Sequence, residues 1–262
     1  MIAWRALLLV YRAIALYGDP PHEIRTPPPH PRKSAPNHRD FPGTPGPRFR
    51  GDPGEFRHSL SDAEVAAGVD SFARFPALAT ALSGGEVEVT FEVARVGRPL
   101  ATLTPMGDDM RWPSPNDTRP DLDRLAPAGA FDSLFVLWPQ RDLATGAEVR
   151  TGGWGLAIRA TDWSNGATYA TVANTSEAVW SRPVVGEVWL HEWLHGVCDH
   201  FARRGYEMPP GDADGGGRAG YESTPAEGWT AYYRDLMTGR VPFENRLVGI
   251  PPEAWRTGSI LR

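Results

Sequence analysis

The stretch from Asp19 to Gly54 interrupts the apolar patterns found in the rest of the chain. It reads DPPHEIRTPPPHPRKSAPNHRDFPGTPGPRFRGDPG, with a proline every few residues and no apolar periodicity. A segment of this composition buries too little apolar surface to offset the entropy that it loses on ordering. We therefore interpret residues 19–54 as a disordered linker, and we expect the folded domain to span residues 55–262.

Residues 1–18 read MIAWRALLLVYRAIALYG, an apolar run of about the length of a signal peptide. Arg5 and Arg12 interrupt this run, and no clear small-x-small cleavage site follows it. The segment is too short and too charged for a stable membrane span. We expect an export signal, a weak anchor or an extension that lies outside the folded domain.

The composition of the chain excludes some classes of partner. Its 262 residues are 41% hydrophobic, which is enough for a substantial globular core. The formal net charge of -5 gives no electrostatic basis for binding a polyanion, so we expect no nucleic-acid partner. Cys198 is the single cysteine, so an intrachain disulfide is excluded and stability must come from packing or a metal.

Periodic patterns predict the secondary structure of residues 55–262. A capping box at Ser61 to Glu64 and apolar residues at helical spacing predict a first helix that ends near Gly84. Alternating or continuous apolar runs then predict strands over residues 87–93, 131–139, 154–160 and 167–173. Two further helices are predicted over residues 184–204 and 225–237. The order of these elements indicates an α+β fold.

The helix predicted over residues 184–204 carries the segment VWLHEWLHGVCDHF. His191 and His195 lie one turn apart on such a helix, so both rings project from one face toward a common point, as two zinc ligands would. Glu192 lies about 100° around the helix from His191, beside a bound metal. There it could polarise a zinc-bound water and pass the proton to a leaving amine. His200 faces the opposite way.

This H-E-x-x-H pattern resembles that of the zincin metallopeptidases. The resemblance implies a zincin-like α+β fold, in which a mixed sheet supports an active-site helix and a second helix follows toward the C-terminus. It also implies a Zn²⁺ cofactor held by His191 and His195, Glu192 as general base, and a peptide or protein substrate. In this resemblance, residues 167–173 look like the counterpart of the edge strand that pairs with an extended substrate, although an ordinary edge strand fits the same sequence equally well. The metzincin continuation is not present, because position 201 is phenylalanine and the glycine is already Gly196.

Zinc needs a third protein ligand, and two residues compete for this role. Glu227 lies in STPAEGWTAYY, which resembles the segment that supplies the third ligand in gluzincins, although Thr224 to Glu227 is also a capping box. Asp214 lies with Asp212 in the glycine-rich loop GDADGGG and would make the site aspzincin-like, although aspartate and glycine are also ordinary turn residues.

Two further inferences concern the surroundings of the metal. Asp199, one turn after His195, could accept a hydrogen bond from that ring and fix its tautomer. Tyr221 is our candidate for stabilising the negative charge that develops on the substrate carbonyl oxygen.

Two other functions stay open, a binding domain with a structural or absent metal and a zinc hydrolase of a non-peptide amide. Glu192 argues against the first, because a structural metal needs no general base.

Overall fold

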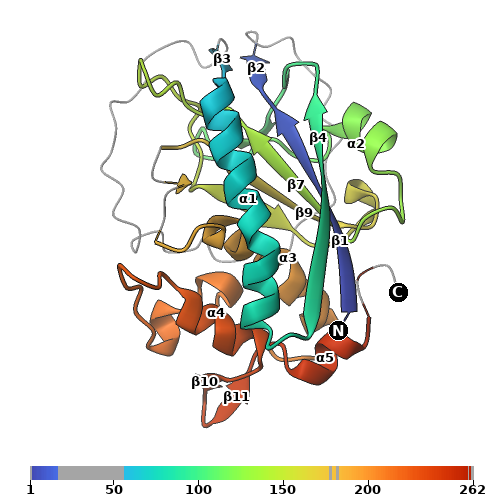
Figure 1. Cartoon of the computed structure of the whole chain (residues 1–262), viewed down its shortest axis with the longest axis vertical. Helices are drawn as coiled ribbons and strands as arrows, with labels where there is room; N and C mark the ends of the chain where they lie inside the picture. Colours follow the sequence, from blue (N-terminus) through green and yellow to red (C-terminus); the bar gives the residue numbers. More distant parts are fainter. Residues whose placement is uncertain (1, 17–55, 177–178, 181–182, 259, 261–262) are drawn as a thin grey trace.

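The computed structural model describes residues 2–16, 56–176, 179–180, 183–258 and 260 (Figure 1). The predicted linker over residues 19–54 lies outside the described residues. The central element is a five-stranded sheet with the strand order β4-β1-β7-β9-β8. Its strands are β4 (Val87–Val96), β1 (Ile2–Tyr11), β7 (Ser133–Trp138), β9 (Thr168–Ala173) and β8 (Gly155–Ile158).

The sheet is mixed. β1 pairs in parallel with both β4 and β7, and β7 pairs in parallel with β9. β8 runs antiparallel to β9, with Leu156 opposite Thr171. A mixed sheet together with five α-helices among the described residues confirms the predicted α+β fold.

The expectation that residues 1–18 lie outside the folded domain is wrong for the described residues 2–16. β1 lies between two neighbours in the sheet, with Leu8 opposite Val93 on one side and Phe135 on the other. Leu8 is fully buried. The short strand β2 (Ala13–Leu16) continues from β1 and pairs antiparallel with β3 (Phe56–Ser59). A strand that is buried on both faces is a continuous apolar run, so its sequence has the same appearance as the apolar core of a signal peptide.

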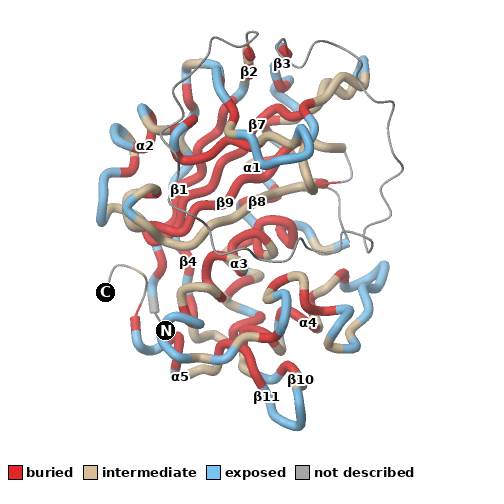
Figure 2. The backbone as a smooth tube through the Cα atoms, turned by 180° about the vertical axis from the view of Figure 1, so that it is seen from behind, coloured by how far each residue is buried: buried red, intermediate tan, exposed pale blue. Residues whose placement is uncertain are grey.

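Each face of the sheet has its own hydrophobic core, because successive side chains of a strand point to opposite faces. On one face Ala6, Leu8 and Val10 pack among residues of four helices, namely α1 (Asp62–Leu82), α3 (Glu187–Arg203), α4 (Thr230–Met237) and α5 (Pro252–Arg256). On the other face Leu7 and Leu9 pack in a cluster that includes Leu122 of α2 (Arg119–Leu125). Figure 2 shows the buried strands between these layers.

The first helix forms as its sequence predicts. The Ser61 hydroxyl accepts a hydrogen bond from the Glu64 backbone N–H at 3.2 Å, and the Glu64 carboxylate accepts one from the Ser61 N–H at 2.8 Å. This reciprocal capping box starts α1, which continues through Pro76 to Leu82. No helix among the described residues is both long enough and apolar enough to cross a membrane.

Two of the predicted elements differ from the structure. Residues 168–173 form β9, which is an interior strand with neighbours on both sides. The prediction that residues 167–173 are the edge strand is therefore wrong, and the edge strand beside α3 is β8. The last predicted helix begins at Thr230 and not at Pro225. Gly228 has a φ of 53°, which a right-handed helix cannot accommodate, and residues 224–228 form a turn instead.

The remaining elements are short. Two hairpins pair β5 (Thr104–Pro105) with β6 (Arg111–Trp112) and β10 (Val241–Phe243) with β11 (Arg246–Val248). Three 3-10 helices among the described residues are η2 (Asp162–Ser164), η4 (Asp212–Asp214) and η5 (Gly217–Ala219). The second of these, η4, contacts α3 and α4 and so brings the glycine-rich loop to the helix that carries the histidine pair.

Candidate metal centre

The helix α3 is fixed on the sheet by close contacts along its apolar face. A Cβ atom at Gly196 would lie 3.0 Å from the Ile158 carbonyl oxygen of β8 and equally close to the Thr168 side chain of β9. Glycine therefore lets the helix backbone approach the two strands. One turn earlier, the Trp193 indole N–H donates to the Ser133 hydroxyl at 2.9 Å. These contacts leave the opposite side of α3, which carries the histidine pair, facing the loop of residues 205–216.

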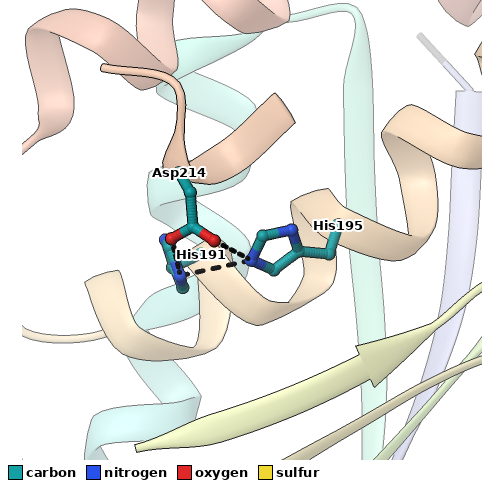
Figure 3. A group of neighbouring side chains, drawn as sticks. All are labelled: His191, His195 and Asp214. Carbon is teal, nitrogen blue, oxygen red and sulfur yellow. Dashed lines mark hydrogen bonds and ion pairs between the residues drawn. The ribbon is translucent and has the colours of Figure 1, made fainter. Parts of the chain in front are cut away.

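The two imidazole rings project from α3 into common surroundings, as the helical spacing predicts (Figure 3). The Nε2 atoms of His191 and His195 are 3.3 Å apart, and the ring planes are close to perpendicular at 85°. Two like ring nitrogens at this distance can both direct a lone pair at one ion. The two rings are therefore placed closely enough to supply two donors to one ion.

Asp214 completes a group of three donors. Its Oδ1 atom lies 3.4 Å from the Nε2 atom of His191, and its Oδ2 atom lies 3.7 Å from the Nε2 atom of His195. In Figure 3 the carboxylate reaches down from the loop above α3 toward both rings. Among the described residues, His191, His195 and Asp214 form the one group of His, Cys, Asp and Glu side chains whose donor atoms converge closely enough to hold a metal.

The far nitrogen of each ring is held by another side chain. The Nδ1 atom of His191 lies 2.8 Å from the Tyr233 hydroxyl, and the Nδ1 atom of His195 is hydrogen-bonded to the Asp212 carboxylate. An ionised carboxylate only accepts hydrogen bonds, so Nδ1 of His195 carries the proton. Contacts of this kind fix the tautomer in which Nε2 carries no proton, as a metal-binding nitrogen must. The same Asp212 oxygen also accepts from the Ala213 N–H at 2.7 Å, so the carboxylate is itself held in place.

Glu192 is buried beside the group of three donors, with 5% of its surface exposed. Its Oε1 atom is 3.9 Å from the Nε2 atom of His191, and its carboxyl group lies against Gly155 of β8. Burial raises the pKa of Glu192 to about 8, against the opposite effect of the neighbouring His195. The negative charges of Asp214 and Asp212 contribute to this raised pKa. The carboxylate of Glu192 therefore holds a proton more strongly than that of an exposed glutamate does.

The charges around the two rings favour a cation. Burial by itself would lower the pKa of His195, but the adjacent Asp212 raises it to about 9. Three acidic side chains, Asp212, Asp214 and Glu192, surround the two imidazoles and stabilise positive charge there. A divalent ion placed between neutral histidines would meet the same compensating charge, so the residues present fit a metal.

Two of the predicted site residues are not brought into this group. Glu227 is exposed in the turn before α4, where its backbone N–H donates to the Thr224 hydroxyl at 3.0 Å. The Tyr221 hydroxyl donates to the Asp235 carboxylate of α4 at 2.5 Å. Of the two candidates for the third ligand, the structure thus brings Asp214 and not Glu227 to the histidines. The predicted role of Tyr221 at the reacting carbonyl has no support from its position.

The residues next to the histidine pair on α3 also differ from expectation in part. Asp199 does not hold the His195 ring, because its carboxylate pairs with Arg203 at 3.2 Å and with Arg159 at 3.6 Å. His200 packs edge-on against Trp4, away from the metal group, as the helical position predicts.

Sequence reasoning missed the roles of Asp212 and Tyr233 beside the two rings. The available signals were the D-x-D pattern in the glycine-rich loop and the Tyr232-Tyr233 pair that follows it. Neither pattern says which ring an oxygen would meet, because both lie in segments whose approach to α3 is set by long-range packing.

No protein-family model, curated protein or solved structure matches this chain. In the site itself, two imidazoles and one carboxylate converge beside a buried glutamate.

Proposed function

We propose that the protein is a zinc-dependent hydrolase of peptide bonds, in which His191, His195 and Asp214 bind the metal and Glu192 is the general base. The observation that carries this proposal is the convergence of the two Nε2 atoms and the Asp214 carboxylate on one point. Choosing Asp214 over Glu227 makes the proposed site aspzincin-like among the zincins that the motif resembles.

The donor set supports zinc in a catalytic role. Zinc prefers nitrogen and oxygen or sulfur donors in tetrahedral geometry, and structural sites supply four protein ligands. Among the described residues only three donors converge, which leaves a fourth position for water or substrate, as catalytic sites do. A buried glutamate beside the open position has no purpose in a structural site. The set therefore favours an enzyme over a binding domain with a structural metal.

The proposed reaction gives each residue one task. A zinc ion in this site would act as a Lewis acid that lowers the pKa of a water molecule and polarises the scissile carbonyl group. Glu192 takes a proton from the water and then delivers it to the nitrogen of the departing amine. Asp212 and Tyr233 keep the two rings turned so that their Nε2 atoms face the metal.

The position of β8 at the edge of the sheet supports a peptide as the proposed substrate. Among the residues that the structure describes, β8 pairs with β9 alone, so its other side can add an extended peptide as a further strand. Gly155 of β8 lies against the Glu192 carboxyl group. A peptide aligned along β8 would therefore pass next to the general base.

Two measurements on one variant test the proposed function. Glu192→Gln removes the base but none of the three donors, so the variant should bind one zinc per chain like the wild type. Peptide cleavage should fall by at least about a hundredfold, since general base catalysis contributes roughly 10² to 10⁴ in rate. Glu227→Gln, the same change at an exposed glutamate, is the control and should leave cleavage intact. A wild-type protein that binds no zinc would exclude the proposal, and zinc binding without cleavage of any peptide would restrict it to another amide or to binding alone.

A further inference from the structure

We propose that the adjacent tyrosines of α4, Tyr232 and Tyr233, are positioning residues that hold all three metal ligands in place. The inference rests on the proposed metal site and adds the element that gives it its geometry. Both side chains are almost completely buried, with 1% of their surface exposed. They occupy consecutive positions on the helix, so their rings leave it about 100° apart and reach two different parts of the site.

Tyr233 acts on the first ligand. Its hydroxyl lies 2.8 Å from the Nδ1 atom of His191, and the two rings are inclined at 59° with their centroids 6.0 Å apart. When Nε2 binds a metal, Nδ1 carries the proton and donates a hydrogen bond to the tyrosine oxygen. The hydroxyl thus fixes both the rotation of the ring and its tautomer.

Tyr232 acts on the other two ligands through the loop backbone. Its hydroxyl donates to the carbonyl oxygen of Asp212. The side chain of Asp212 is the acceptor for Nδ1 of His195, and Asp214 follows two residues later in the same 3-10 helix. One hydrogen bond from α4 therefore fixes the segment that orients the second ligand and supplies the third.

The glycines after Asp214 are necessary for this contact. A Cβ atom at Gly215 would lie 2.5 Å from the Tyr232 hydroxyl oxygen, and one at Gly216 would lie 2.8 Å from the Trp229 ring. Glycine at both positions lets the loop lie directly on α4. Gly215 and Gly216 are thus explained by the close approach between the loop and the side chains of Trp229 and Tyr232.

The start of α4 is tied to the start of α3, which carries the histidines. The backbone N–H of Trp229, the residue before α4, donates to the carboxylate of Glu187, the first residue of α3. Glu187 is fully buried at this junction. Because the two helices are joined here, the tyrosines have a fixed relation to the rings that they orient.

Three tyrosine-to-phenylalanine variants of the whole chain test the inference. Y232F and Y233F each remove one hydroxyl of the proposed pair. Y221F removes a hydroxyl that donates to Asp235 of the same helix and not to a ligand or its loop, so it is the matched control. Zinc affinity is measured by competition with a chromophoric chelator, the coordination geometry by the absorption spectrum of the Co²⁺-loaded protein, and the stability of the metal-free protein by thermal unfolding.

We expect Y232F and Y233F to weaken zinc binding by about 10- to 100-fold, as losses of outer-sphere partners do, and to alter the Co²⁺ spectrum. Y221F should match the wild type in zinc affinity and in the Co²⁺ spectrum, although its metal-free form loses a comparable hydrogen bond. Should Y232F not fold, G215A breaks the same contact from the loop side and should weaken zinc binding equally. If the zinc affinities of Y232F, Y233F and G215A equal that of Y221F, the role of the tyrosine pair is overturned, but the proposed metal site is not. A wild-type chain without zinc affinity would overturn the metal site as well.

Discussion

Gly155 on the edge strand β8 lies directly against the carboxyl group of Glu192 on α3. A Cβ atom at position 155 would overlap the Cγ, Cδ and Oε1 atoms of the glutamate. The φ of Gly155 is not in the left-handed region, so space and not backbone conformation requires glycine here. The strand that would hold a substrate and the side chain that would act on it are therefore fitted to each other at one residue.

Replacing Gly155 by alanine should impair catalysis without removing the metal. The added methyl group displaces the Glu192 carboxylate, and a shift of about 1 Å in a reacting group can cost roughly a hundredfold in rate. Steady-state kcat/KM and zinc content measure the two effects separately. Gly97→Ala is the control, because a Cβ atom there meets no other atom within 4 Å. Unchanged kcat/KM in G155A would show that the position of Glu192 does not limit the reaction.

Asp214 and Glu227 can be distinguished as third ligands by parallel substitutions. Asp214→Ala removes a donor that faces both Nε2 atoms, so zinc affinity should fall by more than the roughly 100-fold that outer-sphere losses reach. Glu227→Ala removes an exposed side chain in a turn and should leave the zinc affinity as in the wild type. Chelator competition measures both, and a loss confined to E227A would reverse the assignment.

The place of β1 in the sheet predicts a large loss of stability for Leu8→Ala. Leu8 is fully buried in the core between the sheet and α1, and a buried leucine-to-alanine change costs about 2 to 5 kcal/mol. Leu247→Ala makes the same chemical change where 63% of the residue is exposed, and it should cost less than about 0.5 kcal/mol. Urea unfolding gives both free energies. Similar values for the two variants would show that residues 2–11 are not part of the folded core.

His200 should make the protein less stable as the pH falls from about 6.5 toward 4. Burial, assisted by Arg204, lowers the pKa of His200 in the folded protein to about 4. Between these values the unfolded chain binds a proton that the folded chain does not, so the stability contribution is complete above the unfolded pKa and is lost on acidification. Because the ring is only partly buried, solvent screening should reduce the effect to roughly 1 kcal/mol.

His200→Phe keeps an aromatic ring beside Trp4 and Phe201 and removes the titrating group. The free energy of unfolding of this variant should therefore depend less steeply on pH between 4 and 6.5 than that of the wild type. Chemical unfolding at several pH values makes the comparison. Equal slopes for both proteins would mean that the ring titrates alike in the folded and unfolded chains.

Local periodicity was sufficient to predict most of the helices and strands that support the site. The capping box of α1, the alternation in β4 and the helical spacing from Trp189 to Phe201 all depend on neighbours within a few residues. Such patterns are fixed by the chain itself. The pattern of β1 was equally visible, but its apolar run suits a buried parallel strand and a signal peptide alike.

The helical spacing in the sequence is enough to place His191 and His195 on one face of a helix with Glu192 beside them, because four residues make about one helical turn. Long-range packing brings Asp214 and not Glu227 to the two rings, and it places Tyr233 and Asp212 against them. It also placed β8, not β9, at the edge of the sheet. These relations join segments that are distant in the chain, and they depend on how the glycine-rich loop and α4 pack on α3, which no local pattern encodes.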